Sequence, residues 1–81
     1  MESPSEELRW VDAAVQGDHG AFAQLIDRYK APVYSLAYRM LGSASDAEDA
    51  AQEIFVRAYT KLATFDRTRK FSTWLLSIAS N

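Results

Sequence analysis

Cysteine is absent from the 81-residue sequence, which excludes disulfide bonds and thiolate metal ligands. Histidine occurs once, at His19, so no second histidine can share a metal ion with it. No apolar run approaches the ~20 residues that a membrane-spanning helix requires. The N-terminus is acidic and polar, unlike a secretory signal. These absences predict a cytoplasmic protein with no membrane span, metal centre or cofactor.

Glycine and proline are also scarce, with three and two residues, and no long stretch alternates apolar and polar residues. Apolar residues instead recur at helical spacing between the few helix-breaking residues. The length allows one domain, and 48% hydrophobic with 25% charged residues is an ordinary globular composition. The sequence therefore predicts one all-α domain, a small four-helix bundle.

Capping residues mark the ends of the four predicted helices. The predicted N-terminal caps are Ser3, Asp18, Ser45 and Ser72. Glycine is predicted to end the first helix at Gly17 and the second at Gly42. Pro32 lies within the second helix and predicts a kink or a break there. The fourth helix reaches the end of the sequence without a cap, so we expect a fragment of a longer protein.

The net charge of -2 conceals an uneven distribution of charge along the chain. Residues 1–55 contain four basic and ten acidic side chains, whereas residues 56–81 contain five basic and one acidic. Such a division indicates two partner surfaces of opposite sign, although ordinary solvated helix faces would also produce it.

No arrangement of residues indicates an enzyme. Asp46, Asp49 and Glu53 lie close together in the sequence, but they lack the glycine-containing loop of calcium sites. No base or nucleophile accompanies them. We therefore expect no catalytic residue, no metal ligand and no small-molecule substrate.

The third predicted helix carries a polar stripe opposite its apolar side. At about 100° per residue, this stripe contains Asp49, Gln52, Glu53, Val56 and Thr60. An apolar residue ringed by polar ones is typical of a docking surface. Single exposed valines are nevertheless common, and the residues alone favour that simpler interpretation.

A basic segment, Arg67, Arg69 and Lys70, follows the third helix and is flanked by Phe65 and Trp74. Cations interleaved with aromatic rings suit single-stranded nucleic acid, because the rings stack on bases and the cations neutralise phosphates. Hydroxyl and amide side chains follow at Ser72, Thr73, Ser77, Ser80 and Asn81. The alternative is that both rings belong to the core and the arginines are merely solvated.

Three segments together resemble region two of bacterial sigma factors of the extracytoplasmic-function branch. They are Gly17 to Leu25, Asp46-Ala47-Glu48-Asp49-Ala50-Ala51-Gln52-Glu53-Ile54-Phe55-Val56, and Phe71 to Asn81, which contains Trp-Leu-x-x-Ile-Ala-x-Asn. The resemblance extends from about residue 6 to the end, and it implies a helical bundle within a dissociable subunit of RNA polymerase.

The resemblance also implies the partners. The third helix would dock on the clamp helices of the largest subunit of core RNA polymerase. The next loop and the fourth helix would bind the non-template strand of the promoter -10 element as it melts, with one base flipped into a pocket. An anti-sigma factor would regulate the protein, and a second domain, absent here, would read the -35 element.

The candidate residues for these contacts follow from motif position and from the basic segment. The polymerase-binding candidates are Asp46, Asp49, Gln52, Glu53, Val56 and Thr60. The DNA-binding candidates are Phe65, Arg67, Thr68, Arg69, Lys70, Ser72, Thr73, Trp74, Ser77 and Asn81. Serine at positions 77 and 80, where the family commonly has bulky or basic residues, predicts weaker phosphate contact.

A second hypothesis is a helical module that binds a regulatory protein and never contacts DNA. It predicts that Arg67 and Arg69 pair with acidic groups inside the bundle and that Phe65 is buried. The loop from Asp66 to Lys70 would then have no nucleic-acid partner.

Overall fold

A computed structural model describes residues 4–80 of the chain. In this range the chain forms four α-helices and one short 3-10 helix, and no strand. They are α1 (Pro4–Val15), α2 (His19–Leu41), α3 (Ala44–Lys61), η1 (Leu62–Thr64) and α4 (Phe71–Ser80). The predicted all-α fold of four helices is confirmed. None of these helices combines the length and apolar character needed to cross a bilayer.

The connection between α1 and α2 is a tight turn fixed by local hydrogen bonds. Gly17 has φ 102°, and its N–H donates to the Ala14 carbonyl at 3.0 Å. The Asp18 N–H donates to the Ala13 carbonyl at 3.0 Å, which completes a Schellman motif. The Asp18 carboxylate then caps α2 by accepting from the Ala21 N–H at 3.1 Å. The predicted ends of both helices are confirmed here.

α2 continues without interruption through Pro32 to Leu41. The alternative of a break at Pro32 is therefore wrong. Proline removes only one backbone donor, and the apolar stripe of α2 stays in phase on both sides of it. Gly42, at φ 71°, ends the helix as predicted, and its N–H donates to the Tyr38 carbonyl at 2.7 Å.

Two predicted caps are wrong by two residues each. Ser43, not Ser45, caps α3, because Ser43 has extended φ and ψ and accepts from the Asp46 N–H. α4 begins at Phe71, where the Trp74 N–H already donates to the Lys70 carbonyl, so Ser72 lies inside the first turn. The predicted cap at Ser3 lies outside the described residues.

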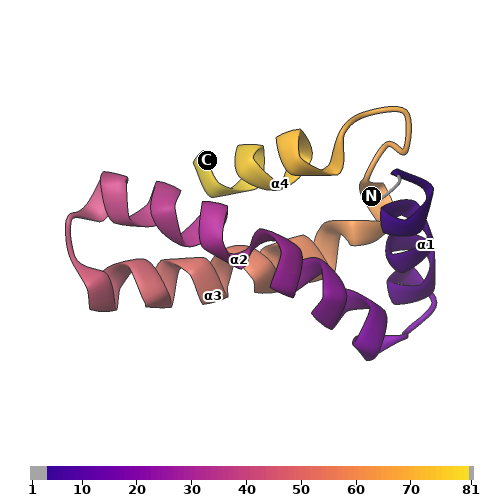
Figure 1. The fold of residues 1–81 in the computed structure, drawn as a ribbon, viewed down its shortest axis with the longest axis horizontal. Helices are drawn as coiled ribbons and strands as arrows, with labels where there is room; N and C mark the ends of the chain where they lie inside the picture. The colour runs from indigo at the N-terminus through magenta and orange to yellow at the C-terminus, as the bar shows by residue number, and fades with distance from the viewer. Residues whose placement is uncertain (1–3, 81) are drawn as a thin grey trace.

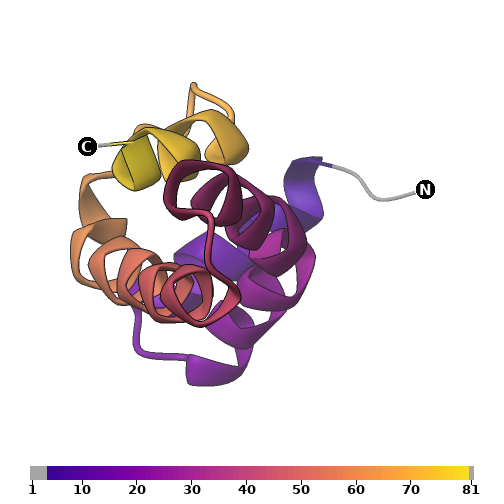
Figure 2. The same ribbon diagram turned by 90° about the vertical axis from the view of Figure 1, so that its left-hand side faces the viewer.

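The helices form an antiparallel hairpin covered from two directions. α2 and α3 run in opposite directions along the long axis of the molecule (Figure 1), and they share the most extensive packing in the fold. α1 crosses one end of this hairpin, and α4 lies over α2 and α3 on another side (Figures 1 and 2). The loop between η1 and α4 therefore lies near the end of the molecule that carries α1.

Every helix contributes to one hydrophobic core. Alanine fills buried positions on both hairpin helices, at Ala37 and Ala47 among others, and such small side chains allow α2 and α3 to approach closely. The connected core comprises Val11, Ala14, Ala21, Phe22, Leu25, Val33, Ile54, Phe55, Ala58, Leu62, Phe65, Phe71, Leu75 and Ile78.

A half-buried polar network joins α1 to α2. Arg28 donates from Nη1 to Glu7 Oε1 at 3.4 Å, and its guanidinium lies 4.7 Å from the centre of the Trp10 ring. The Tyr29 hydroxyl donates to the same oxygen of Glu7. Because only 15% of the Glu7 side chain is exposed, this network fixes the position of its carboxylate.

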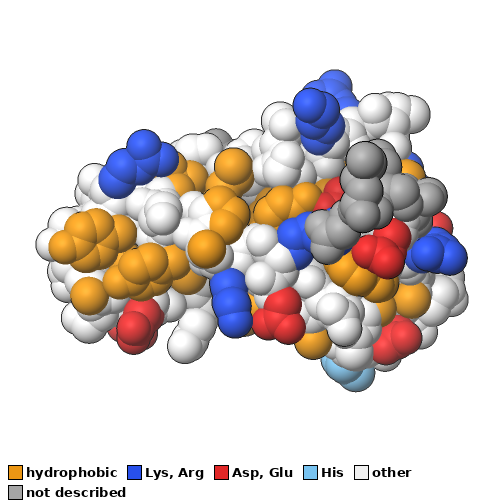
Figure 3. Space-filling view, viewed as in Figure 1, with side chains coloured by type: hydrophobic (Ala, Val, Ile, Leu, Met, Phe, Trp, Pro, Cys, Tyr) orange, Lys and Arg blue, Asp and Glu red, His pale blue; other side chains and the backbone are white. Residues whose placement is uncertain are grey.

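The end of the hairpin farthest from α1 is less well covered. Tyr38, Met40 and Leu41 near the end of α2 remain exposed, and Figure 3 shows apolar side chains gathered at this end of the molecule. The core therefore lies mainly between α1, α4 and the nearer half of the hairpin.

Two leucine truncations on α2 test this assignment of the core. Leu25 is 1% exposed and Leu41 is 50% exposed. We expect Leu25→Ala to lower the free energy of unfolding by about 2–5 kcal/mol, because it leaves a cavity. Leu41→Ala, measured by the same urea titration, should cost less than about 1 kcal/mol. Equal losses in the two variants would contradict this location of the core.

Candidate docking and nucleic-acid interfaces

The polar stripe of α3 lies on the outside of the bundle. Its five residues, Asp49, Gln52, Glu53, Val56 and Thr60, are all exposed, as is the further candidate Asp46. Val56 is the most exposed large apolar side chain in the described residues, at 63%. The prediction that these side chains share the solvent side of the helix is confirmed, and they surround an apolar group with carboxylates and polar groups.

An apolar groove adjoins this stripe on the side facing the first half of α2. It encloses about 490 Å³. Its lining comprises His19, Phe22, Ile26, Gln52, Phe55, Val56, Tyr59 and Thr60. Val56 is thus the edge of a larger apolar surface rather than an isolated exposed valine.

The sequence did not single out the members of this groove that come from α2. The sequence indicates of His19 only that no second histidine can share a metal ion with it, but in the structure its ring stacks on Tyr59 with centroids 5.9 Å apart. Phe22 packs edge-on against the same tyrosine at 5.0 Å. The one indication of this groove in the sequence is Tyr59. It follows Val56 by three residues and therefore lies on a neighbouring part of the helix surface.

The loop that follows η1 is anchored by a buried ring at each end. Phe65 is 3% exposed and Phe71 is 2% exposed, and their rings meet edge-on at 5.4 Å. Trp74, half-buried, packs on both at 5.3 Å and 5.5 Å. Phe65 therefore belongs to the core and has no free face for stacking on a base, as the alternative interpretation of this ring anticipated.

Ion pairs and hydrogen bonds order the segment between the two anchors. The Arg67 Nε donates to Asp12 Oδ1 on α1 at 2.6 Å. The Arg69 Nε lies 3.8 Å from Asp66 Oδ2. Both pairs are exposed to solvent, so each contributes little energy and yields readily to a competing anion. Among residues 4–80, the amine of Lys70 forms no ion pair.

A short hydrogen-bonded turn carries Asp66 and Thr68. Asp66 Oδ1 accepts from the Thr68 hydroxyl at 2.7 Å and from the Thr68 backbone N–H at 2.9 Å. The hydroxyl bond, then the backbone bond, and to a lesser degree the charge of Arg69, lower the pKa of Asp66. The carboxylate thus stays ionised and keeps the turn closed at neutral pH.

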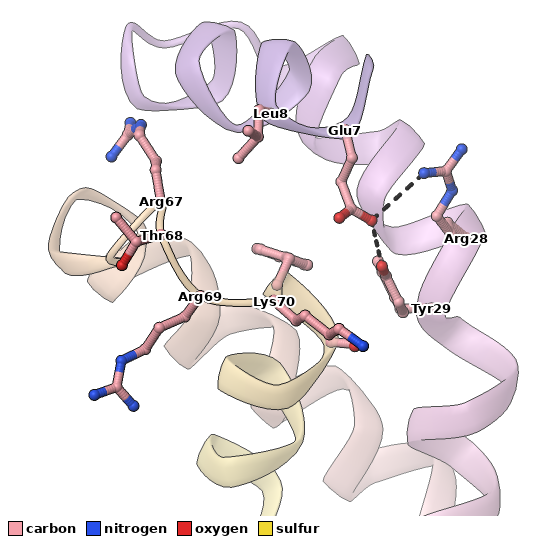
Figure 4. Close-up of a pocket in the computed structure, with 10 residues that line it drawn as sticks. Glu7, Leu8, Arg28, Tyr29, Arg67, Thr68, Arg69 and Lys70 are labelled. Atoms are coloured by element: carbon pink, nitrogen blue, oxygen red, sulfur yellow. Dashed lines mark hydrogen bonds and ion pairs between the residues drawn. The ribbon is translucent and has the colours of Figure 1, made fainter. Parts of the chain in front are cut away.

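A pocket of about 530 Å³ lies between this loop, α1 and α2. Figure 4 shows Glu7 of α1 above the pocket, Lys70 below it, and Arg28 and Tyr29 of α2 at the right-hand side. The pocket lining comprises Glu7, Leu8, Arg28, Tyr29, Arg67, Thr68, Arg69, Lys70, Phe71 and Ser72. Four of these residues come from α1 and α2, which sequence reasoning did not connect with the basic segment.

α4 presents a row of small polar groups. Thr73 and Ser77 are exposed and Ser72 is half-buried. The Ser77 hydroxyl donates to the Trp74 carbonyl at 2.6 Å, and the Ser80 hydroxyl to the Leu76 carbonyl at 2.9 Å. Asn81 lies outside the described residues. The candidate DNA-binding residues thus gather on the loop and α4, apart from the α3 stripe.

No group of three or more His, Cys, Asp or Glu side chains within residues 4–80 is arranged to hold a metal ion. The candidate interfaces include two hollows, the groove beside Val56 and the pocket beside the loop. Their chemistry differs, because the groove beside Val56 is apolar and the pocket beside the loop is rich in charge.

Comparison with known proteins gives a consistent result. The family model described as Sigma-70 region 2 matches residues 25–81. The ECF RNA polymerase sigma factor SigW of Bacillus subtilis is 56% identical over 66 residues, 82% of this chain and 35% of SigW. The ECF RNA polymerase sigma-E factor of Escherichia coli is 41% identical over 71 residues, 88% of this chain and 37% of that protein.

A solved structure also resembles the fold. It is an NMR structure of an engineered region 2 of sigmaE in complex with GTAAAA, with a TM-score of 0.84 and 43% identity. The match covers 94% of this chain and 78% of the other. The chain spans less than half the length of the two sigma factors named above.

The Asp66 turn yields a prediction about pH. Thr68→Ala removes the hydroxyl that lowers the pKa of Asp66 most, so this pKa should rise. A lowered pKa stabilises the folded state above the unfolded-state pKa, and this effect is lost as pH falls through the folded pKa. The stability advantage of the wild type over T68A should therefore be full at neutral pH and shrink in acid.

An NMR titration of the Asp66 side-chain carboxyl carbon in both proteins measures the change directly. Thr60→Ala is the control, because the Thr60 hydroxyl donates to the Arg57 carbonyl and not to a carboxylate. An Asp66 pKa that is the same in T68A and the wild type would contradict the assigned cause.

Proposed function

Because this chain belongs to the Sigma-70 region 2 family and is homologous to ECF sigma factors, we propose that it binds core RNA polymerase and the promoter -10 element in transcription initiation. It does so as a binding domain without an active site. The observation that carries the proposal is the separation of two exposed surfaces, an apolar and acidic one on α3 and another made of the basic loop and the small polar groups of α4.

The α3 surface has the composition of a protein interface. Val56 and the adjoining groove supply apolar area, and Asp49, Gln52 and Glu53 form a polar rim around it. Apolar centres with polar rims are the usual anatomy of such contacts. The partner that fits this surface is a helix with apolar and basic side chains, and we assign it to the clamp helices of the largest polymerase subunit.

The loop and α4 suit a single strand of DNA. Arg67, Arg69 and Lys70 can neutralise phosphates, and the related region 2 of sigmaE has been solved with GTAAAA. One base of the non-template strand would enter the pocket beside the loop. Flipping a base costs a few kcal/mol, which stacking and hydrogen bonds inside the pocket offset.

Individual residues take different parts in this proposal. Thr68, Ser72, Thr73 and Ser77 would offer hydroxyl groups to the strand, and Asn81 would face the upstream edge of the element. Trp74, half-buried, would support the loop and expose one edge of its ring. Phe65 would act only from the core, by fixing the first end of the loop.

The second hypothesis, a module that binds only a regulatory protein, has specific support. Phe65 is buried, and Arg67 and Arg69 pair with Asp12 and Asp66, as that hypothesis expects. We favour DNA binding because both pairs lie on the surface rather than inside the bundle, so phosphates can replace the carboxylates. An anti-sigma factor would compete for either exposed surface.

Substitutions on α3 test the polymerase contact. Val56→Ser and Glu53→Ala should each weaken binding to core RNA polymerase by about fivefold or more, the effect of losing roughly 1 kcal/mol at an interface. Glu48→Ala is the matched control, because Glu48 is exposed on α3 but lies outside the stripe. Circular dichroism should show unchanged folding in all three. Binding that is equal in the wild type and both stripe variants would contradict the proposal.

The salt dependence of DNA binding tests the loop. Lys70→Ala should reduce the slope of log K against log salt by about 0.7, the value for one phosphate on a single strand. Fluorescence anisotropy with labelled GTAAAA provides the measurement. Arg57→Ala, on the α3 side of the molecule, should leave the slope unchanged. An unaltered slope in K70A, or equal affinity for every sequence, would count against strand capture by this loop.

A further inference from the structure

The pocket beside the loop presents cations at its rim and an ion pair on its inner wall. Its rim carries Arg67, Arg69 and Lys70, and all three are exposed. Its inner wall carries the half-buried carboxylate of Glu7, paired with Arg28, which also lines the pocket. A phosphate is attracted to the three cations at the rim, whereas the charge of Arg28 is balanced by Glu7. A nucleotide with its phosphate at the rim directs its base toward Glu7.

Apolar side chains line the pocket beside Glu7. Phe71 of α4 is held by its contacts with Tyr29, Phe65 and Trp74, at centroid distances of 5.4, 5.4 and 5.5 Å. Because Phe71 is only 2% exposed, it supports the pocket from the core and does not offer a face to a base. Leu8 of α1 is half-buried and provides the apolar contact for a base in this orientation.

The Glu7 carboxylate is fixed with one oxygen available. Oε1 accepts from Arg28 Nη1 and from the Tyr29 hydroxyl. Figure 4 shows the other oxygen on the side of the carboxylate away from these two donors, toward the pocket. A carboxylate only accepts hydrogen bonds, so it selects a base edge that carries donors.

We propose that Glu7 is a specificity-determining residue that selects guanine at the base pocket, an inference that rests on the proposed binding of the -10 strand. Guanine alone presents two adjacent donors, N1–H and the N2 amino group, on its Watson–Crick edge. Adenine and cytosine each place an acceptor nitrogen beside their amino group, and that acceptor would face the carboxylate. Thymine has one N–H between two carbonyl oxygens.

The test compares the wild-type chain with Glu7→Gln on single-stranded oligonucleotides. Each position of GTAAAA is replaced in turn by guanine, inosine, adenine, cytosine and thymine, and the Kd is measured by anisotropy. At one position the wild type should prefer guanine to adenine by about tenfold or more, because a hydrogen bond to a charged group is lost. Inosine, which lacks the N2 amino group, should bind between the two. E7Q should reduce the preference to within about twofold.

A control variant separates reading of the base from support of the fold. Glu6→Gln removes the same charge from the same helix and also lies beside Arg28, but Glu6 does not line the pocket. E6Q should retain the guanine preference. A preference that persists in E7Q, or is lost equally in E6Q and E7Q, would overturn the proposal.

Competition by free nucleotides distinguishes guanine selection by Glu7 from the proposed binding of the -10 strand. Guanosine monophosphate should displace a labelled oligonucleotide at a lower concentration than adenosine monophosphate from the wild type, and at an equal concentration from E7Q. Isothermal titration with each nucleotide alone gives the same comparison without DNA. If no oligonucleotide sequence is preferred but this Glu7-dependent order holds, the proposed function fails and the guanine site stands. A different pair of results would reject the guanine site and leave the proposed function intact. In that case the wild type binds both nucleotides equally, and its guanine preference on DNA is unchanged in E7Q.

Discussion

The packing of Phe65 against Phe71 is the contact on which the candidate DNA surface depends. The two rings close the ends of a five-residue loop, with Trp74 and Tyr29 packed around them. The cations within the loop cannot be buried without a large desolvation cost. They are therefore held at the surface by neighbours that are buried. A loop fixed in this way loses less conformational entropy when it binds a partner.

This arrangement assigns the aromatic residues a role that differs from the simplest interpretation of the sequence. Cations interleaved with rings suggest stacking on bases, but here Phe65 and Phe71 face the core and only the cations face outward. The pocket is formed by the loop together with residues far away in sequence, above all Glu7 and Arg28. Because these two rings do not protrude from the surface, a base would contact the protein inside the pocket.

Local signals in the sequence predicted the helices well. Asp18, Gly17 and Gly42 mark helix ends correctly because capping depends on residues within four positions of one another. The error at Ser45 arose because a second candidate cap, Ser43, stands two residues before it. The error at Ser72 arose because α4 begins at Phe71, without a capping side chain before it. Which of two neighbouring residues takes extended φ and ψ depends on the turn before it, and tertiary packing decides that.

The walls of the pocket could not be predicted for a different reason. Glu7 and Arg28 are 21 residues apart, and Asp12 and Arg67 are 55 apart. Neither pair lies on one helix or follows from a spacing rule. Both result from the angle at which α1 crosses the hairpin, which is set by the packing of Val11 and Ala14 in the core. Helical periodicity identifies those two core residues, but it does not indicate what they bring together at the surface.

The two surfaces also share a rigid support. α3 passes directly into η1, and Leu62 and Phe65, at the junction with the loop, are both buried. The loop therefore cannot change its direction relative to α3 without breaking the core. A partner that holds the α3 stripe thereby fixes the position of the basic loop in space. Because the bundle is small and rigid, a partner bound to the α3 stripe can orient a DNA strand on the basic loop. No conformational change between the two surfaces is needed.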